Sequence, residues 1–241
     1  MRIAVLSDVH GNTPALKAII ESIKQNNIDR IIYLGDVVGI GPEPDKCLDL
    51  IIENNFEMVL GNHELYYVRG TEIDPEMSDY EREHHNWIKN LLTDKHYEFL
   101  SKCPLSIKIE ENNFKLMFQH FLIDETTFEQ YPFHGFCVLK ESIINQLVDE
   151  LDTDYIFIGH EHRPYEVEYN NKKLIDGGSS GCVYDDITHY TIIDINDNVN
   201  VNVTRNEIKY NRDELINIFR TGEDFPLKEY LGENFFGIKV K

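Results

Sequence analysis

The sequence is poor in the features that mark secreted and membrane-spanning proteins. It has four cysteines in 241 residues and no Cys-x-x-Cys pair, which argues against a thiolate zinc site and a dithiol redox motif and favours reduced thiols. No apolar run approaches the ~20 residues of a transmembrane helix, and the run before Asp8 is too short for the core of a signal peptide. We therefore expect a cytoplasmic protein that does not bind a membrane.

Positive charge is also scarce. Lysine and arginine number 23 against 43 aspartate and glutamate residues, so the formal net charge is −20. Proteins that bind long nucleic acids or anionic membranes use a basic surface to neutralise phosphates, and this chain lacks that surplus. If the chain acts on a phosphate compound, bound metal cations are the obvious source of local positive charge.

The chain is long enough to bury one sizeable core, and its pattern is that of a layered α/β domain. Up to about residue 160, apolar runs of strand length alternate with amphipathic stretches of helix length. Thr13 is the expected N-cap of the first helix, ahead of Pro14. The predicted strands are 3–6, 30–34, 57–60, 115–118 and 155–158, and the predicted helices are 14–26, 43–54, 79–92, 94–101 and 139–150.

Beyond residue 164 the pattern changes to short alternating segments separated by turn signals, which predict antiparallel strands. These strands either extend a sheet or form a second sheet packed against the first. A capped helix is expected at about 211–220. The last twenty residues are too apolar to be solvated, so they are expected to pack on the domain or on a second copy in a homo-oligomer.

Potential ligands follow every one of the five predicted strands. Residues at the carboxyl ends of strands in an open α/β sheet converge from distant parts of the chain, and ligands bind there. In the last case, FIGHEHRP, the two histidines are two residues apart and so face the same side of an extended segment. The donors are Asp8, His10, Asp36, Asn62, His120, His160 and His162.

These donors form an oxygen and nitrogen shell that suits Mn, Fe, Zn or Ni. Seven donors exceed the needs of one tetrahedral ion. They suit two ions that share a bridging carboxylate. In phosphoryl transfer, this arrangement binds both the attacking oxygen and the leaving oxygen.

The same motifs resemble the signature of the calcineurin-like metallophosphoesterases, in order and at plausible spacing. They are Asp8-x-His10, Gly35-Asp36-x-x-Gly39, Gly61-Asn62-His63-Glu64, His120 and Gly159-His160-x-His162. The chain is most similar to the compact bacterial and archaeal, phosphodiesterase-like members in which GDVVGIGPEP follows the second strand. The resemblance implies a four-layer α/β/β/α sandwich of two mixed β-sheets flanked by helices. We expect the domain to span 1–210, with a helical lid or wall at 66–105, and to be followed by a C-terminal helix and tail at 211–241.

By resemblance, Asp8, His10 and His162 hold one metal ion, Asn62, His120 and His160 hold the other, and Asp36 bridges them. The cofactors implied are two divalent transition-metal ions, with Mn favoured, and a hydroxide between them is the nucleophile. His63 would be catalytic without being a ligand, as a general acid or as a charge partner of the phosphate.

Three departures from the family pattern leave roles open. Glu64 stands where small bacterial members usually have Asp, Glu161 replaces a more frequent Thr, and Asp176-Gly-Gly-Ser179 replaces Asn-Pro-Gly-Ser. Candidate substrate contacts are Arg69 and Arg163, the basic residues nearest the motifs, and His134 at the pocket rim.

The leading hypothesis is a metal-dependent phosphoesterase that hydrolyses a phosphomonoester or phosphodiester of a small soluble or nucleotide-like compound. One alternative is a phosphoprotein phosphatase, which depends on Glu64 alone. Another is a non-catalytic metal-binding scaffold, but a scaffold has no need to retain His63.

Overall fold

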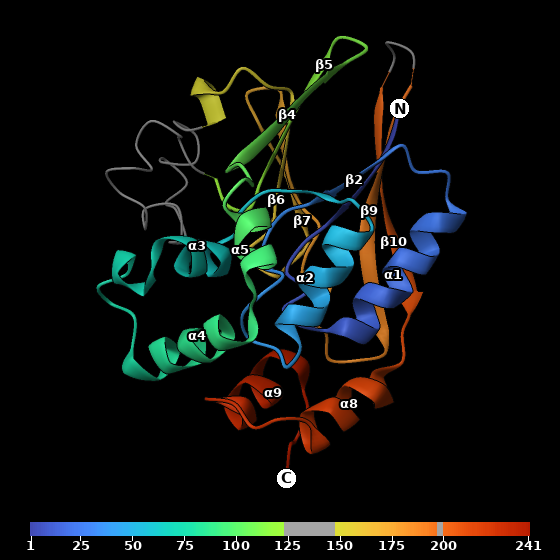
Figure 1. Cartoon of the computed structure of the whole chain (residues 1–241). Helices are drawn as coiled ribbons and strands as arrows, with labels where there is room; N and C mark the ends of the chain where they lie inside the picture. Colours follow the sequence, from blue (N-terminus) through green and yellow to red (C-terminus); the bar gives the residue numbers. More distant parts are fainter. Residues whose placement is uncertain (123–147, 197–199) are drawn as a thin grey trace.

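Two five-stranded β-sheets pack face to face, and helices cover them on the outside (Figure 1). The structure, a computed structural model, describes residues 1–122, 148–196 and 200–241. The strand orders are β10-β9-β1-β2-β3 and β4-β5-β6-β8-β7. Each sheet mixes parallel and antiparallel pairs, which confirms the predicted sandwich of two mixed sheets flanked by helices.

The strands of the first sheet are β1 (Arg2–Leu6), β2 (Arg30–Tyr33), β3 (Glu57–Met58), β9 (Ile187–Ile195) and β10 (Val201–Lys209). Those of the second are β4 (Ser106–Glu111), β5 (Phe114–Gln119), β6 (Tyr155–Ile158), β7 (Tyr165–Tyr169) and β8 (Lys172–Asp176). The α-helices are α1 (Thr13–Gln25), α2 (Pro44–Glu53), α3 (Asn62–Arg69), α4 (Asp79–Leu91), α5 (Asp94–Leu100), α8 (Arg212–Thr221) and α9 (Lys228–Phe236).

The four strands after residue 164 divide between the two sheets. β7 and β8 extend the second sheet, where β8 pairs in parallel with β6, while β9 and β10 extend the first, where β9 pairs antiparallel with β1. Both hairpins therefore extend a sheet that already contains earlier strands, and neither forms a sheet by itself.

Apolar side chains between the sheets form one core. Ile3 and Val5 of β1 alternate with residues that face the helices, so β1 is buried on both faces. Phe118 and Phe157 from the second sheet stack with ring centroids 5.1 Å apart. This burial, at roughly 25 cal/mol per Å² of apolar surface, holds the two sheets together.

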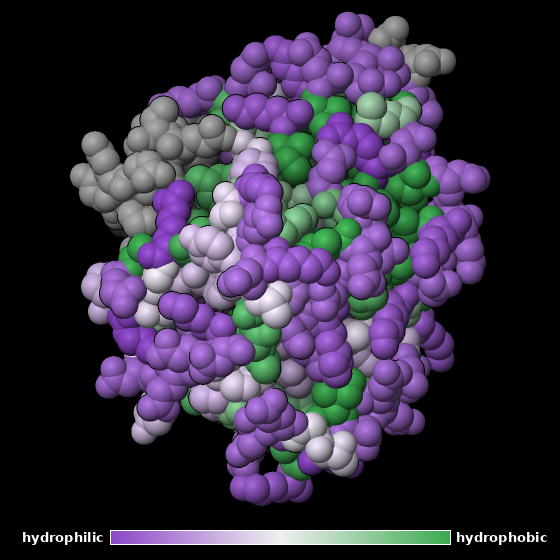
Figure 2. Space-filling model, viewed as in Figure 1, coloured by the Kyte–Doolittle hydropathy of each residue, from purple (hydrophilic) through white to green (hydrophobic). Residues whose placement is uncertain are grey.

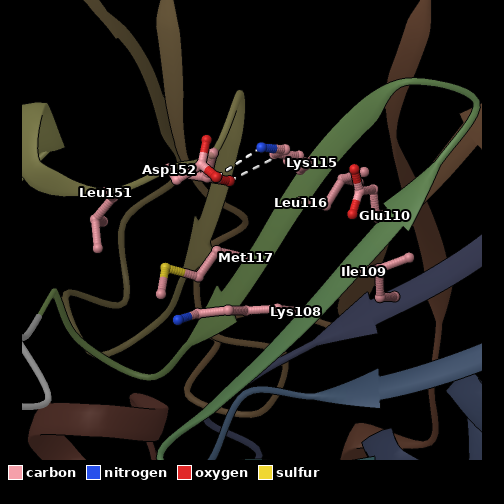
Figure 3. A pocket seen from close by; sticks show the side chains of 9 residues that line it. Lys108, Ile109, Glu110, Lys115, Leu116, Met117, Leu151 and Asp152 are labelled. Atoms are coloured by element: carbon pink, nitrogen blue, oxygen red, sulfur yellow. Dashed lines mark hydrogen bonds and ion pairs between the residues drawn. The ribbon is translucent and has the colours of Figure 1, made fainter.

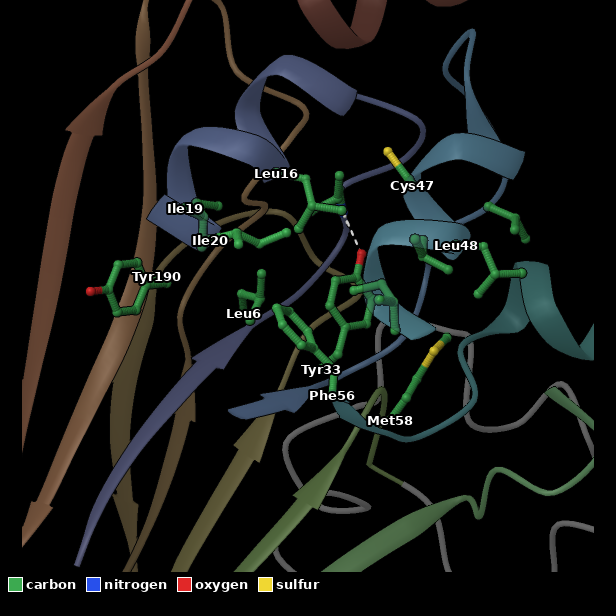
Figure 4. Packing of buried hydrophobic residues seen from close by; sticks show 14 of the residues in the cluster. Leu6, Leu16, Ile19, Ile20, Tyr33, Cys47, Leu48, Phe56, Met58 and Tyr190 are labelled. Atoms are coloured by element: carbon green, nitrogen blue, oxygen red, sulfur yellow. Dashed lines mark hydrogen bonds between the residues drawn. The ribbon is translucent and has the colours of Figure 1, made fainter. Parts of the chain in front are cut away.

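The outer face of the first sheet is covered by α1 and α2 (Figure 4). Leu16 and Leu48 from these helices pack with Leu6 and Tyr33 from the strands. The buried Tyr33 hydroxyl also accepts a hydrogen bond of 2.9 Å from the Val9 backbone N–H. Tyr33 of β2 thus helps to fix the loop that carries two of the candidate ligands.

The secondary structure differs from the sequence prediction at one helix cap and in elements that the pattern did not indicate. Asn12, and not Thr13, is the N-cap of α1, because its side chain accepts a hydrogen bond from the Ala15 N–H while Thr13 and Pro14 already lie inside the helix. The sequence analysis did not predict α3 and β4. The helix predicted at 139–150 falls largely outside the described residues.

The C-terminal segment packs on the domain. Leu215 and Phe219 of α8 and Phe236 of α9 share a buried cluster with Ala15 of α1, and Trp87 of α4 stacks on Phe225 at 4.6 Å. In Figure 1, α8 and α9 lie below α1 and α2. Hydrophilic residues cover most of the face shown in Figure 2. Within the described residues, no helix has the length and apolar character that crossing a membrane requires.

Candidate metal centre

The five motifs meet just beyond the carboxyl ends of β1, β2, β3, β5 and β6, where the chain turns sharply. Five of the predicted ligands have positive φ angles, between 47° and 75°. Residues other than glycine adopt this left-handed region at a cost, and such strain concentrates at functional sites. The residues are Asp8, His10, Asp36, His160 and His162.

One group of donors gathers around His10. The Nε2 atoms of His10 and His162 are 3.1 Å apart, and His162 Nε2 lies 3.5 Å from Asp8 Oδ1. The thiol of Cys182 joins this group, since one donor atom from each of His10, His162 and Cys182 falls within 4.8 Å of the others. The sequence analysis did not predict this sulfur, because Cys182 is isolated in sequence.

A second group gathers around Asn62. Its Oδ1 atom lies 3.2 Å from His120 Nε2 and 3.1 Å from His160 Nδ1. Asp36 Oδ2 stands between the groups, 3.1 Å from His120 Nε2 and 3.8 Å from His10 Nε2. The structure therefore brings all seven predicted donors together in two adjacent clusters with Asp36 between them.

Backbone carbonyls orient two of the imidazoles. His10 Nδ1 lies 3.1 Å from the Val38 carbonyl, and His120 Nδ1 lies 2.8 Å from the Leu34 carbonyl. A carbonyl only accepts, so each Nδ1 carries the proton that it donates, and in the neutral ring the Nε2 lone pair faces the site. Metal-bound histidines in proteins are held in this way.

Glu64 organises the loops behind the site. Its carboxylate is fully buried and accepts hydrogen bonds of 2.7 to 3.0 Å from the backbone N–H groups of Asp36, Val37, Val38 and Gly61. Burial and the nearby Asp36 charge raise the pKa of Glu64 to about 7, while the N–H donors oppose this shift. Glu64 thus ties the loop after β2 to the start of α3, a role that the sequence left open.

His63 reaches the site from the first turn of α3. Its backbone N–H donates to Asp36 Oδ1 at 3.1 Å, and its ring lies edge-on to His10 at 5.1 Å. The buried Nδ1 atom has no hydrogen-bond partner among the described residues. Gly39 makes room for the ring, since a Cβ there would lie 2.3 Å from Nδ1. His85 of α4 stacks on the ring at 5.1 Å.

Electrostatics at the site require compensating positive charge. Although burial opposes both shifts, nearby histidines lower the pKa of Asp8 and Asp36 below the usual range, so both carboxylates are ionised. Burial also opposes protonation of His120, yet the Asp36 carboxylate raises its pKa to about 9. Divalent cations can supply the same compensation with neutral imidazoles as ligands. The donor set therefore fits metal ions.

The loop after β8 supports the Asp8 segment. The Ser179 hydroxyl donates to the Asp8 carbonyl at 2.7 Å, and the Ser180 N–H donates to the Ser7 carbonyl at 2.9 Å. The Asp176 carboxylate is buried nearby and accepts from the Gly178 N–H at 2.7 Å. This loop thus helps to position Asp8 through its serines. The Glu161 side chain, in contrast, is exposed.

A cavity of about 250 Å³ opens beside His63 between α3, α4 and α9. Neither predicted arginine contact lines it: Arg69 is exposed at the end of α3, and Arg163 is exposed after His162. His134 lies outside the described residues. Helices α3 to α5 fill most of the predicted lid at 66–105, and α3 and α4 form one side of this cavity.

Comparisons with known proteins agree with this fold and site. Residues 1–198 match the model of the calcineurin-like phosphoesterase superfamily domain. The chain is 31% identical over 255 residues to the uncharacterized protein MJ0912 of Methanocaldococcus jannaschii, with 97% of each chain covered.

Two crystal structures share the fold over nearly the whole chain. A metallophosphoesterase from Sphaerobacter thermophilus matches with a TM-score of 0.70 at 23% identity, covering 96% of this chain and 98% of its own. The hypothetical protein PH1004 from Pyrococcus horikoshii OT3 matches with a TM-score of 0.71 at 17% identity, covering 99% of both. The motifs, the fold and the sequence match together show that this chain belongs to the calcineurin-like phosphoesterase superfamily.

Proposed function

We propose that this protein is a metal-dependent phosphoesterase that hydrolyses a phosphomonoester or phosphodiester of a small soluble compound. Asp8, His10 and His162 would hold one divalent cation and Asn62, His120 and His160 a second, with Asp36 bridging the two. The observation that carries the proposal is the position of Asp36 Oδ2 between His10 and His120, with the other donors divided between its two sides. Only a carboxylate among these side chains can bridge two cations.

When bound, the cations would supply Lewis acidity toward the phosphate oxygens and a hydroxide nucleophile at neutral pH. The surrounding residues hold this arrangement. Glu64 fixes the backbone on both sides of Asp36, and the Leu34 and Val38 carbonyls fix the ring orientations of His120 and His10.

His63 is placed to assist the leaving group. Its Nδ1 atom has no hydrogen-bond partner among the described residues, and the side chain lies between the donor clusters and the cavity. Burial lowers its pKa well below the usual value, so the ring is neutral before substrate arrives. A phosphate group beside the ring favours protonation, since an opposite charge stabilises the imidazolium. The protonated ring can then donate to the departing oxygen.

The basic test is hydrolysis by protein reconstituted with Mn, Fe, Zn or Ni, assayed on a generic phosphomonoester, a generic phosphodiester and a panel of nucleotides. Metal-dependent turnover of at least one class is expected, and chelation should remove it. A metal-loaded protein that hydrolyses none of them would instead support a non-catalytic scaffold.

His63→Ala tests the assignment of the acid. Metal content should stay near that of the wild type, while kcat for phenyl phosphate falls by about 10²- to 10⁴-fold, as expected for loss of an acid–base residue. The loss should be smaller for 4-nitrophenyl phosphate, whose leaving group needs little protonation. Equal losses on both substrates would assign His63 to charge stabilisation, and full activity on both would remove it from the mechanism.

A further inference from the structure

The cavity beside His63 is built from parts of the chain that lie far apart in sequence. Asn62, His63 and Tyr66 come from α3, His85 from α4, and Tyr230 and Phe235 from α9. Because Asn62 and His63 belong to both the donor clusters and the cavity wall, the cavity is continuous with the site. A phosphate held at the donors would project its leaving group past His63 into this space.

Backbone strain marks the cavity as well as the ligand loops. Thirteen described residues other than glycine have positive φ angles, and only two of them, Ile40 at 57° and Leu227 at 64°, are aliphatic. Both line this cavity. A β-branched or bulky residue adopts this conformation only where surrounding structure enforces it. The loop that carries Ile40 and the C-terminal segment that carries Leu227 are therefore held so that these side chains complete the cavity wall.

The walls are aromatic. Tyr66 lies edge-on to both His63 and His85, with ring centroids 6.1 Å and 4.9 Å apart. Tyr230 and Phe235 of α9 contribute further rings. Ring walls of this kind bind planar apolar groups through face and edge contacts. The volume, about 250 Å³, lies below the roughly 300–1,000 Å³ of pockets for drug-sized ligands, so one small ring-bearing group fits and a polymer does not.

The charge of the cavity is negative. Asp74 and Glu81 line it, and no lysine or arginine does so among the described residues. Asp74 Oδ2 accepts from the Tyr66 hydroxyl at 3.3 Å and Glu81 Oε2 accepts from the Ser78 hydroxyl at 2.8 Å. Neither carboxylate has an ion-pair partner in the part of the chain that the structure describes. A second phosphate or a carboxylate would meet repulsion here, whereas a neutral or cationic group would not.

We propose that this cavity is the leaving-group subsite, and that it selects phosphoesters with an uncharged or cationic aromatic leaving group over those with an anionic one. Asp74 and Glu81 are then specificity-determining residues, and α9 supplies the outer wall. This inference rests on the proposed function, since it places the substrate phosphate at the donor clusters.

Three aryl phosphates that carry a neutral, an anionic or a cationic group at one ring position test the proposal. They are phenyl phosphate, 4-carboxyphenyl phosphate and 4-(aminomethyl)phenyl phosphate, assayed with metal-loaded full-length protein. The carboxylate makes the phenol a slightly better leaving group, so chemistry alone would favour the anionic substrate. We expect its kcat/KM to be about tenfold lower than that of phenyl phosphate, equivalent to ~1.4 kcal/mol. The cationic substrate should be at least as good as phenyl phosphate.

The double variant Asp74→Asn and Glu81→Gln keeps both side-chain shapes and removes both charges. It should raise kcat/KM for the anionic substrate relative to phenyl phosphate by about tenfold, largely through KM. Glu83→Gln is the matched control, because Glu83 is exposed on the same helix and does not line the cavity. It should leave the substrate ratio unchanged. Circular dichroism and thermal unfolding confirm that each variant is folded.

Tyr230→Ala provides a second test that does not depend on charge. Tyr230 is 59% exposed, so its removal should not disturb folding, and KM for phenyl phosphate should rise several-fold as one ring of the wall is lost. The leaving-group assignment would be wrong if the protein hydrolysed the three aryl phosphates without regard to charge, or if the double variant left the charge preference unchanged. Either result would leave the phosphoesterase function intact. The proposed function itself would be wrong if the metal-loaded protein hydrolysed none of the substrates, including the generic phosphodiester and the nucleotides.

Discussion

The cavity beside His63, at about 250 Å³, adjoins the donor clusters, whereas a second cavity, at about 350 Å³, lies at the start of β5. The second cavity is lined by residues of β4 and β5 and by residues 151–153, which precede β6 (Figure 3). Its charged groups are at the surface, and Lys115 forms an ion pair of 2.6 Å with the exposed Asp152. The donor clusters instead follow the ends of β5 and β6.

The volumes of the two cavities do not distinguish them. They differ in whether potential ligands from several strand ends come together nearby. At the carboxyl ends of the strands, seven potential ligands from separate loops approach one another, and five of them have left-handed backbone. In the second cavity most of the lining side chains, such as Lys108 and Glu110, come from one hairpin, and the others come from residues 151–153. The comparison indicates that potential ligands gather where several strands end together, as expected for α/β sheets.

Asp36→Asn should give the largest effect. An amide cannot bridge two cations as a carboxylate does, so metal content and activity should be lost together, with metal affinity falling by at least about 100-fold. Metal analysis after dialysis and steady-state kinetics measure the two losses. The exposed Asp213→Asn is the control. If the variant kept its metal, Asp36 would not be the bridge.

Glu64→Gln should mainly reduce stability. Four backbone N–H groups point at the carboxylate, and a glutamine offers them one acceptor oxygen in place of two. We expect the free energy of unfolding to fall by about 2–3 kcal/mol, the cost of weakened bonds to a charged group and of a buried donor left unpaired. Urea unfolding measures this, with the exposed Glu233→Gln as control. Unchanged stability would mean that the four contacts are not important to the fold.

Gly39→Ala should reduce activity without removing metal. The added Cβ would collide with His63, and the φ angle of +86° is unfavourable for alanine. Displacement of the ring by about 1 Å can cost as much as about 100-fold in rate. Gly70→Ala is a matched control, because Gly70 has a φ of +92° but its added Cβ meets only the mobile end of the Glu72 side chain. Equal effects of both substitutions would point to backbone strain and not to His63.

Lys115→Ala should give the smallest effect. It removes the ion pair with Asp152 at the second cavity, where the pair is exposed and therefore screened by solvent. Metal content, kcat and KM are expected to match those of the wild type. A clear fall in activity would show that the second cavity also takes part in function.

Much of the strand framework was readable from the sequence, because strands carry apolar patterns that do not depend on distant contacts. The strand predicted at 155–158 is β6 with the same bounds, and β1 and β2 each differ from prediction by one residue at one end. Helix α3 was missed because its first residues, Asn62 and His63, were interpreted only as potential site residues. The Thr13 cap was wrong because Asn12 competes for the same role one residue earlier.

The sequence by itself determined which side chains stand at the strand ends, since order along the chain and strand periodicity fix that placement. Only the tertiary structure decided their environment. Glu64 holding four N–H groups, His85 stacked on His63, and α9 closing a cavity more than 150 residues away in sequence all depend on contacts between distant segments. Such contacts are set by packing of the whole core, so a local pattern can name the donors but cannot show what surrounds them.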